Sequence, residues 1–299
     1  MSPGRAAFSR FMRNRLAVGC LILLVLLCLL AAGAPLIEAV LGIDPEAVDL
    51  MARLEPVSAA HPLGTDELGR DVLARLLQGG RVSLAVGLAT ALIAALVGTL
   101  IGVAAGYVGG ALDALLMRLT DGVIALPLLP LLIVLAAVDP AKLGLPAEMV
   151  GSPWFGLARI VAIIGLVGWT TVARLSRAAA LGLRDRDFVR ASRATGAGPL
   201  RIMRRHILPN VVSPVIVATT LSVGNVILLE SALSFLGLGI QPPLPSWGNM
   251  LSGALELIHA SPALAVWPGA MIFLTVLAFN FLGDGLQDAF EPRSPTTRL

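Results

Sequence analysis

The sequence predicts an all-α, polytopic membrane protein with six transmembrane helices. Of the 299 residues, 57% are hydrophobic and only 14% are charged, whereas about a quarter of the residues of a soluble domain are charged. The hydrophobic residues are gathered into runs without charge that are long enough to cross a bilayer. Arginines are concentrated between these runs, as the positive-inside rule describes for multi-pass proteins.

The first hydrophobic run, residues 16–37, contains no charged residue and is long enough to cross about 30 Å of hydrocarbon. A cleaved signal peptide is the competing interpretation, because arginines precede the run and residues 32–34 resemble a cleavage site. The run is longer than a signal-peptide core, however, and Pro35 would directly follow the cut. We therefore predict a retained transmembrane helix at 16–37, after a cytoplasmic segment at 1–15.

The second run, residues 82–112, is 31 residues long without a charge. Glycine recurs in it at every fourth position, as Gly98, Gly102, Gly106 and Gly110. Glycines at this spacing form a smooth helix face, which the backbone of another helix can approach closely. The regular spacing favours such a face over glycines that are merely tolerated in lipid. We therefore expect the four glycines to lie against another helix.

Four further helices complete the prediction. The third span is expected at 115–138, with kinks at Pro127 and Pro130 because proline removes a backbone donor. Arg118 and Asp121 lie one turn apart near its start and are expected to pair. The remaining spans are expected at residues 154–174, 211–229 and 263–283.

The charges between the runs predict the orientation. Segment 174–206 carries nine arginines and two aspartates, whereas segment 38–80 carries eight acidic residues and three arginines. The positive-inside rule places the first segment in the cytoplasm and the second outside the membrane. Six spans then leave both termini cytoplasmic, with residues 289–299 as the C-terminal tail.

Common catalytic and metal-binding motifs are absent from the sequence, so we predict neither catalytic residues nor a metal site. The three histidines are scattered, and there is no H-E-x-x-H, G-x-S-x-G or C-x-x-C motif. A phosphate-binding P-loop requires Gly-Lys-Ser/Thr. The only lysine, Lys142, follows Ala141, so the sequence contains no P-loop; if the function is transport driven by ATP, another subunit must bind the nucleotide. We interpret the arginines as topology signals and predict no nucleic-acid partner.

A secondary transporter or a channel, neither of which needs ATP, is the alternative to a transporter driven by ATP. Such proteins place ionisable residues within the membrane for ion coupling. The candidates here are Arg118, Asp121 and Glu230. Each lies near the end of a predicted helix, where a position at the membrane interface is the simpler interpretation. This alternative stays open at this point.

The cytoplasmic segment 183–210 carries the most specific pattern in the chain. Gly196 and Gly198 interrupt the segment, and Pro199 suits the first turn of a helix, so we predict two short helices over 187–209 joined at Gly196. The segment resembles the EAA loop of bacterial ABC importer permeases, whose pattern is Glu-Ala-Ala, three residues, Gly, nine residues, Ile, any residue, Leu-Pro. The counterparts at the same spacing are Arg190, Ala191, Ser192, Gly196, Leu208 and Pro209. Arg190 replaces the family's glutamate, and His206 replaces its isoleucine.

Two further stretches extend the resemblance over nearly the whole chain. Residues 61–84 and 230–251 are similar to segments of the C-type permease of oligopeptide, dipeptide and nickel importers, and 139–157 looks like an insertion. We interpret 64–71 as a turn before a helix, with contact to a binding protein as the alternative. Residues 241–247 form either a rigid connector or part of the outer mouth of a pore.

The resemblance implies a type I ABC importer permease fold in the bacterial inner membrane, with the permease domain at 81–288. It also implies a second, B-type permease subunit, two ATPase domains that bind ATP and magnesium, and an extracytoplasmic substrate-binding protein. This chain itself would need no cofactor. Alternating access would be coupled to the ATPases through the loop at 187–209. Peptides are the implied substrates, with nickel chelates, opines, glutathione and sugars as alternatives.

Overall fold

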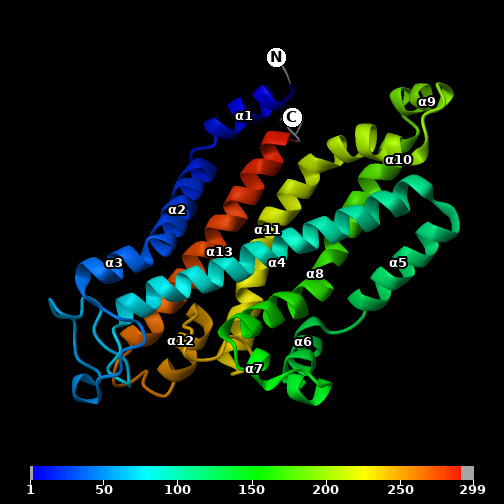
Figure 1. The fold of residues 1–299 in the computed structure, drawn as a ribbon. Helices are drawn as coiled ribbons and strands as arrows, with labels where there is room; N and C mark the ends of the chain where they lie inside the picture. The colour runs from blue at the N-terminus through cyan, green and yellow to red at the C-terminus, as the bar shows by residue number, and fades with distance from the viewer. Residues whose placement is uncertain (1–2, 291–299) are drawn as a thin grey trace.

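Regular structure in this protein is helical over the part of the chain that the computed structural model describes, residues 3–290 (Figure 1). The predicted all-α fold class is confirmed. From residue 291 onward, the predicted tail at 289–299 lies outside the described residues. The elements in chain order are α1 (Pro3–Arg13), α2 (Arg15–Ala32), α3 (Ala34–Leu41), η1 (Leu50–Ala52), α4 (Val72–Val108), α5 (Gly110–Ile124), α6 (Leu128–Ala137), η2 (Pro140–Leu143), α7 (Ala147–Val150), α8 (Pro153–Arg184), α9 (Asp187–Ala194), α10 (Pro199–Ile202), η3 (Met203–Ile207), α11 (Leu208–Phe235), α12 (Trp247–Ala254) and α13 (Ala263–Phe290).

Within the described range, five helices are long and apolar enough to cross a membrane: α2, α4, α8, the helix from Pro199 to Phe235, and α13. A sixth span is obtained when α5 and α6 are counted together, although they meet at an angle of 82°. Pro127 lies in the break between them with extended backbone (φ −64°, ψ 114°) and has no N–H to donate. The kink predicted in the third span is therefore a sharp bend.

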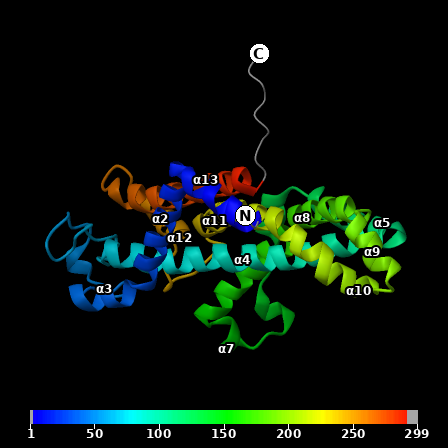
Figure 2. The ribbon, with the colours of Figure 1, turned by 90° about the horizontal axis from the view of Figure 1, so that it is seen from above.

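The connections between the spans gather at two ends of the molecule (Figure 1). One end, which we call the α9 end, holds α1, α9, α10 and the last turn of α13. The opposite end, the α12 end, holds α3, α7 and α12. Figure 2 shows that α7, which belongs to the predicted insertion, projects beyond the layer of long helices. The two ends of the described chain thus lie with the arginine-rich connection between α8 and α11.

Two predicted boundaries differ from the helices that form. α4 begins at Val72, and its N-cap Asp71 accepts a hydrogen bond through Oδ1 from Ala74 N at 2.8 Å. The helix therefore runs without a break through residue 81, where the permease domain was expected to begin. The predicted first span, 16–37, is divided at Gly33 into α2 and the short α3.

α4 packs against α2, α8, α11 and α13 and so organises the core. One apolar cluster joins α2, α4, α11 and α13, and a second joins α4, α6, α8 and α11. Another face of α4 is apolar but exposed, with Leu92, Leu96 and Leu100 exposed by 63%, 63% and 59%. A row of exposed leucines at a spacing of four forms a face that lipid would cover.

Candidate functional site

The connection between α8 and α11 forms a helical hairpin at the α9 end. α9 ends at Ala194, and Gly196 follows with a left-handed φ of +82°, a conformation that glycine adopts without strain. Gly196 N donates to Arg193 O at 3.0 Å, and Ala197 N donates to Ser192 O at 3.1 Å. The turn is thus closed by backbone hydrogen bonds.

The hairpin leads into the fifth span without an intervening loop. The residues from Pro199 to Phe235 form one helix that passes through α10, η3 and α11. We predicted a loop that ends at Pro209 and a span that begins at residue 211. That boundary is wrong, because Pro209 is the second residue of α11 and the helix continues on both sides of it.

A π-helical turn, η3, accommodates Pro209 within this long helix. Leu208 N donates to Met203 O, five residues back, instead of four. Pro209 has no N–H, so it cannot donate to Arg205 O as an α-helix would require. Single π turns of this kind are frequently found at functional sites.

The hairpin is anchored through its apolar side. Val189, Ile202 and Ile207 are buried there in a cluster that also contains Val211 and, at the end of α4, Tyr107. The Arg193 guanidinium lies 5.7 Å from the centroid of the Tyr107 ring, within cation–π range. The hairpin is therefore packed onto α4 as well as joined to α8 and α11.

The opposite side of the hairpin is exposed and basic. The predicted loop residues Arg190, Ala191, Gly196 and Pro209 are exposed, whereas Ser192 and Leu208 are half-buried. Leu200 is 66% exposed. Besides Arg193, the exposed arginines of this surface are Arg190, Arg201, Arg204 and Arg205, and none of these five forms an ion pair with a residue between 3 and 290. We call this surface, residues 190–205, the basic hairpin surface.

The predicted glycine face lies largely between α4 and α8. A Cβ built on Gly98, Gly102 or Gly106 would lie 2.5, 2.3 or 2.6 Å from a backbone carbonyl oxygen of α8. Gly110 does not share this face, because α4 ends at Val108 and Gly110 begins α5 with a φ of +59°. A Cβ on Gly110 would have no heavy atom within 4 Å. The close approach is thus an intramolecular contact of three glycines.

Two ion pairs join α5 to α8. Arg177 donates through Nε to Asp113 Oδ1 at 2.5 Å and through a terminal nitrogen to Oδ2 at 2.7 Å. Arg174 donates to Asp121 Oδ1 at 2.6 Å. The predicted pairing of Asp121 with Arg118 is therefore wrong. Spacing along one helix suggested a partner on the same helix, whereas α5 packs against α8, which supplies Arg174.

A groove of about 560 Å³ opens among α8, α11 and α13. Its walls are mostly small and apolar side chains, with a few polar groups and one charged side chain, Arg186. Sequence periodicity alone did not reveal it, because its walls come from three separate spans. The lining includes Ala178, Ala179, Gly182, Asn210, Ser213 and Gln287.

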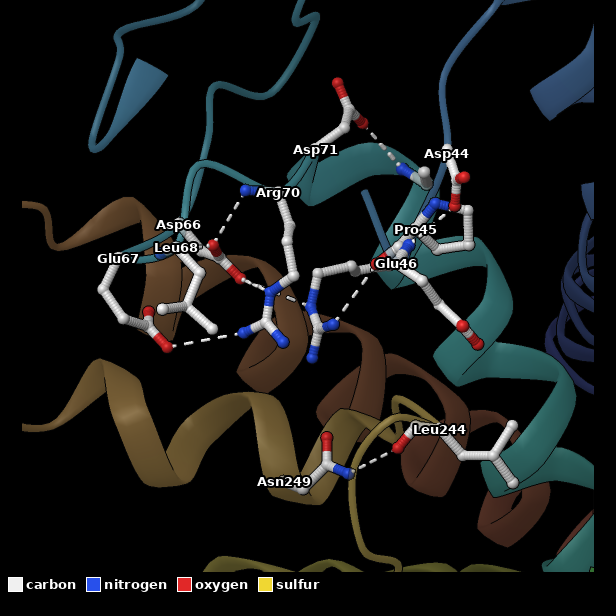
Figure 3. Close-up of polar contacts among 12 residues, drawn as sticks. Asp44, Pro45, Glu46, Asp66, Glu67, Leu68, Arg70, Asp71, Leu244 and Asn249 are labelled. Atoms are coloured by element: carbon white, nitrogen blue, oxygen red, sulfur yellow. Dashed lines mark hydrogen bonds and ion pairs between the residues drawn. The ribbon is translucent and has the colours of Figure 1, made fainter. Parts of the chain in front are cut away.

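Polar residues at the α12 end fix the turn before α4. Asp66 accepts hydrogen bonds from the backbone N–H groups of Leu68 and Arg70 and lies 2.8 Å from Arg70 Nε (Figure 3). Arg75, on α4, approaches Asp66 Oδ2 through Nε at 3.4 Å. The stretch 64–71 is thus a hydrogen-bonded turn in front of a helix, as the first interpretation of it predicted.

Glu230, which we expected at a membrane interface near a helix end, is enclosed by the protein. Its side chain is on α11 near the α12 end and is completely buried, with hydrogen bonds from two serines. Among the described residues, no three His, Cys, Asp or Glu side chains are grouped closely enough to hold a metal ion.

Comparisons with known proteins identify relatives that match nearly the whole chain. The family described as binding-protein-dependent transport system inner membrane component matches residues 98–294, and the family described as N-terminal TM domain of oligopeptide transport permease C matches residues 2–56. The chain is 41% identical over 286 residues to the oligopeptide transport system permease protein of Escherichia coli strain K12, covering 95% of this chain and 89% of that protein. It is 38% identical over 293 residues to the dipeptide transport system permease protein of Alkalihalophilus pseudofirmus, with 98% and 91% covered.

Among solved structures, a chain of the MetNI methionine ABC transporter in inward-facing conformations is similar in fold. The TM-score is 0.56 and the sequence identity is 19%, over 73% of this chain and 96% of that chain. At this identity the likeness concerns the fold alone.

Proposed function

Since the chain belongs to the family of binding-protein-dependent transport system inner membrane components, we propose that it is the permease subunit of an ATP-driven importer of peptides. The predicted type I ABC importer permease fold and the predicted relation to the C-type peptide permeases are confirmed. The energy source, the coupling mechanism and the substrate are the parts that we propose here.

The observation that carries the proposal is the uninterrupted helix from Pro199 to Phe235. Its first turns belong to the exposed basic hairpin surface, and its remainder is a membrane span. A partner that displaces the hairpin therefore displaces the span as well, since no flexible loop lies between them. This connection suits a protein that converts a movement outside the membrane into a movement within it.

We infer that the partner at the basic hairpin surface is an ATPase subunit. The unpaired arginines favour an acidic surface, and exposed Leu200 favours an apolar hollow within it. Two such ATPase domains would bind ATP and magnesium, because this chain contains no P-loop. The chain would then contribute no catalytic residue and no cofactor of its own.

The groove among α8, α11 and α13 is our candidate for this chain's part of the transport path. It is open on one side, so a second, B-type permease subunit would be needed to enclose the substrate. Alternating access requires such a path to open toward one membrane face at a time. Rocking of α11, which lines the groove and continues from the hairpin, would change its width.

Peptides are the proposed substrates because the two relatives described above are named for oligopeptide and dipeptide transport. An extracytoplasmic binding protein would deliver them at the α12 end. Competition for uptake by dipeptides, longer peptides, nickel chelates, opines, glutathione and sugars identifies the substrate class. Uptake that only the non-peptide compounds inhibit would contradict the assignment of peptides as substrates.

A pair of glycine variants tests the coupling role. Gly196 and Gly198 both have open space around a Cβ position, but only Gly196 has a left-handed backbone. A β-branched residue is strained at positive φ, so Gly196→Val should distort the hairpin whereas Gly198→Val should not. In vesicles holding the assembled complex, we expect Gly196→Val to lower uptake per ATP hydrolysed and Gly198→Val to leave it near normal. Equal uptake per ATP in both variants would contradict the coupling role.

A further inference from the structure

A buried carboxyl group connects three separate parts of the α12 end. Glu230 lies on α11 and is 0% exposed. Ser83 on α4 donates through Oγ to Glu230 Oε2 at 3.2 Å, and Ser234 on α11 donates through Oγ to Oε1 at 2.7 Å. No arginine or lysine between residues 3 and 290 forms an ion pair with Glu230. Ser83 and Ser234 therefore bind this carboxyl group by hydrogen bonds without an ion pair beside them.

Each serine hydroxyl also accepts a hydrogen bond from a backbone N–H. One N–H belongs to the connection between α11 and α12, residues 236–246, and the other to Trp247, which follows the connection. Ile240 N donates to Ser234 Oγ at 3.0 Å, and Trp247 N donates to Ser83 Oγ at 3.2 Å. Because each hydroxyl oxygen accepts a backbone N–H, its own proton is directed toward Glu230. Two chains of hydrogen bonds, which we call relays, thus lead from the backbone at Ile240 and Trp247 through a serine hydroxyl to the carboxyl group of Glu230.

The connection packs into the bundle at the place where these relays hold it. Ile240 is only 3% exposed and belongs to the core cluster of α4, α6, α8 and α11. Trp247 is 2% exposed, and its Nε1 donates to Leu76 O on α4 at 3.0 Å. The connection and the start of α12 therefore fill the space between the spans at the α12 end.

A buried carboxyl group is costly unless its hydrogen bonds compensate, and an apolar side chain would pack there without that cost. Its presence is explained if the bonds must hold the connection in one place and still be breakable. We propose that Glu230 is a positioning residue that keeps the 236–246 connection seated between the spans and so closes the α12 end of the transport path between transport events. This proposal rests on the transport function proposed above.

Cysteine labelling measures whether the connection is seated. The background carries Cys20→Ala and Cys28→Ala, and the assembled complex is labelled with a maleimide. Ile240→Cys reports on the connection, and Val189→Cys, at a position that is 0% exposed at the α9 end, reports on unfolding elsewhere. With Glu230→Ala we expect labelling at position 240 to accelerate about tenfold, as the loss of two hydrogen bonds allows. Labelling at position 189 should not change.

Variants of the serines separate the relay from a general loss of packing. Ser83→Ala should accelerate labelling at position 240, but it should add nothing in the presence of Glu230→Ala, because its bond to Glu230 is then already lost. Ser222→Ala is the matched control, since Ser222 is also on α11 but donates only to Thr219 O of its own helix. If Glu230→Ala fails to assemble, Glu230→Gln takes its place, since an amide accepts through only one atom.

Three labelling results would overturn the proposal: unchanged labelling at position 240, equal acceleration at positions 240 and 189, or additive effects of Ser83→Ala and Glu230→Ala. Peptide uptake by the same complexes is measured in parallel. Absence of ATP-driven uptake in the unaltered complex would count against the proposed function. It would not count against the role of Glu230 in keeping the connection seated. Normal uptake with a released connection would refute the claim that the connection closes the path.

Discussion

At the scale of single residues, Gly102 is the glycine of the α4–α8 contact where a side chain has the least room. A Cβ there would lie 2.3 Å from Ala173 O, and backbone atoms cannot move aside as a flexible side chain can. We expect Gly102→Leu to separate α4 from α8 and to destabilise the fold by about 1–3 kcal/mol or more. Thermal unfolding of the purified protein in detergent measures this effect.

Gly122→Leu is the matched control for this substitution. Gly122 also lies within an apolar helix, but no heavy atom lies within 4 Å of its Cβ position. Because Gly102 meets α8 of the same chain, the defect should appear in the isolated subunit and not only on assembly. A Gly102→Leu variant as stable as Gly122→Leu would contradict the close packing of α4 and α8.

The two ion pairs between α5 and α8 should differ in how much they stabilise the folded protein. The side chain of Asp113 is 18% exposed and receives two hydrogen bonds from Arg177, whereas that of Asp121 is 58% exposed and receives one from Arg174. Bidentate, shielded pairs are stronger than exposed ones. Asp113→Asn should therefore lower the unfolding temperature more than Asp121→Asn. The reverse order in a thermal-shift measurement would contradict this ranking.

At the scale of the elements, the π turn sets how the hairpin is oriented on α11. Pro209→Ala supplies the missing N–H, which can donate to Arg205 O and convert η3 into regular α-helix. The substitution deletes no residue, but an α-helix turns further per residue than a π-helix, so the hairpin would rotate relative to the span. We expect an assembled complex with reduced uptake per ATP hydrolysed. Val212→Ala, at an exposed position of α11, is the control and should retain normal coupling.

The elements also show which features the sequence was able to predict. Long uncharged runs identified the spans, and the spacing of Gly98, Gly102 and Gly106 identified a packing face, because both depend on local periodicity. The partner of Asp121 and the burial of Glu230 depend on how distant helices meet, which periodicity does not contain. The bend after α5 and the continuous helix through Pro209 depend on how proline is accommodated, which its presence alone does not decide.

At the scale of the whole molecule, the described chain termini and the basic hairpin surface lie at one end (Figure 1). From the positive-inside rule we expect this end to be cytoplasmic. Single cysteines at Ser192 and Ser58, in a background without Cys20 and Cys28, test the orientation with a membrane-impermeant maleimide. In intact cells, we expect Ser58→Cys to be labelled and Ser192→Cys to be protected. The opposite pattern would reverse the topology.

The central claim is that ATP hydrolysis by partner subunits drives solute through a path that this chain helps to form. Its competitor is transport driven by an ion gradient, with no need for ATP. The complete complex is reconstituted with its binding protein, and ATP is supplied on the hairpin side. Ionophores remove all gradients, and uptake of a labelled peptide is then measured. The account predicts uptake with ATP and magnesium and none with a gradient alone; gradient-driven uptake without ATP would contradict it.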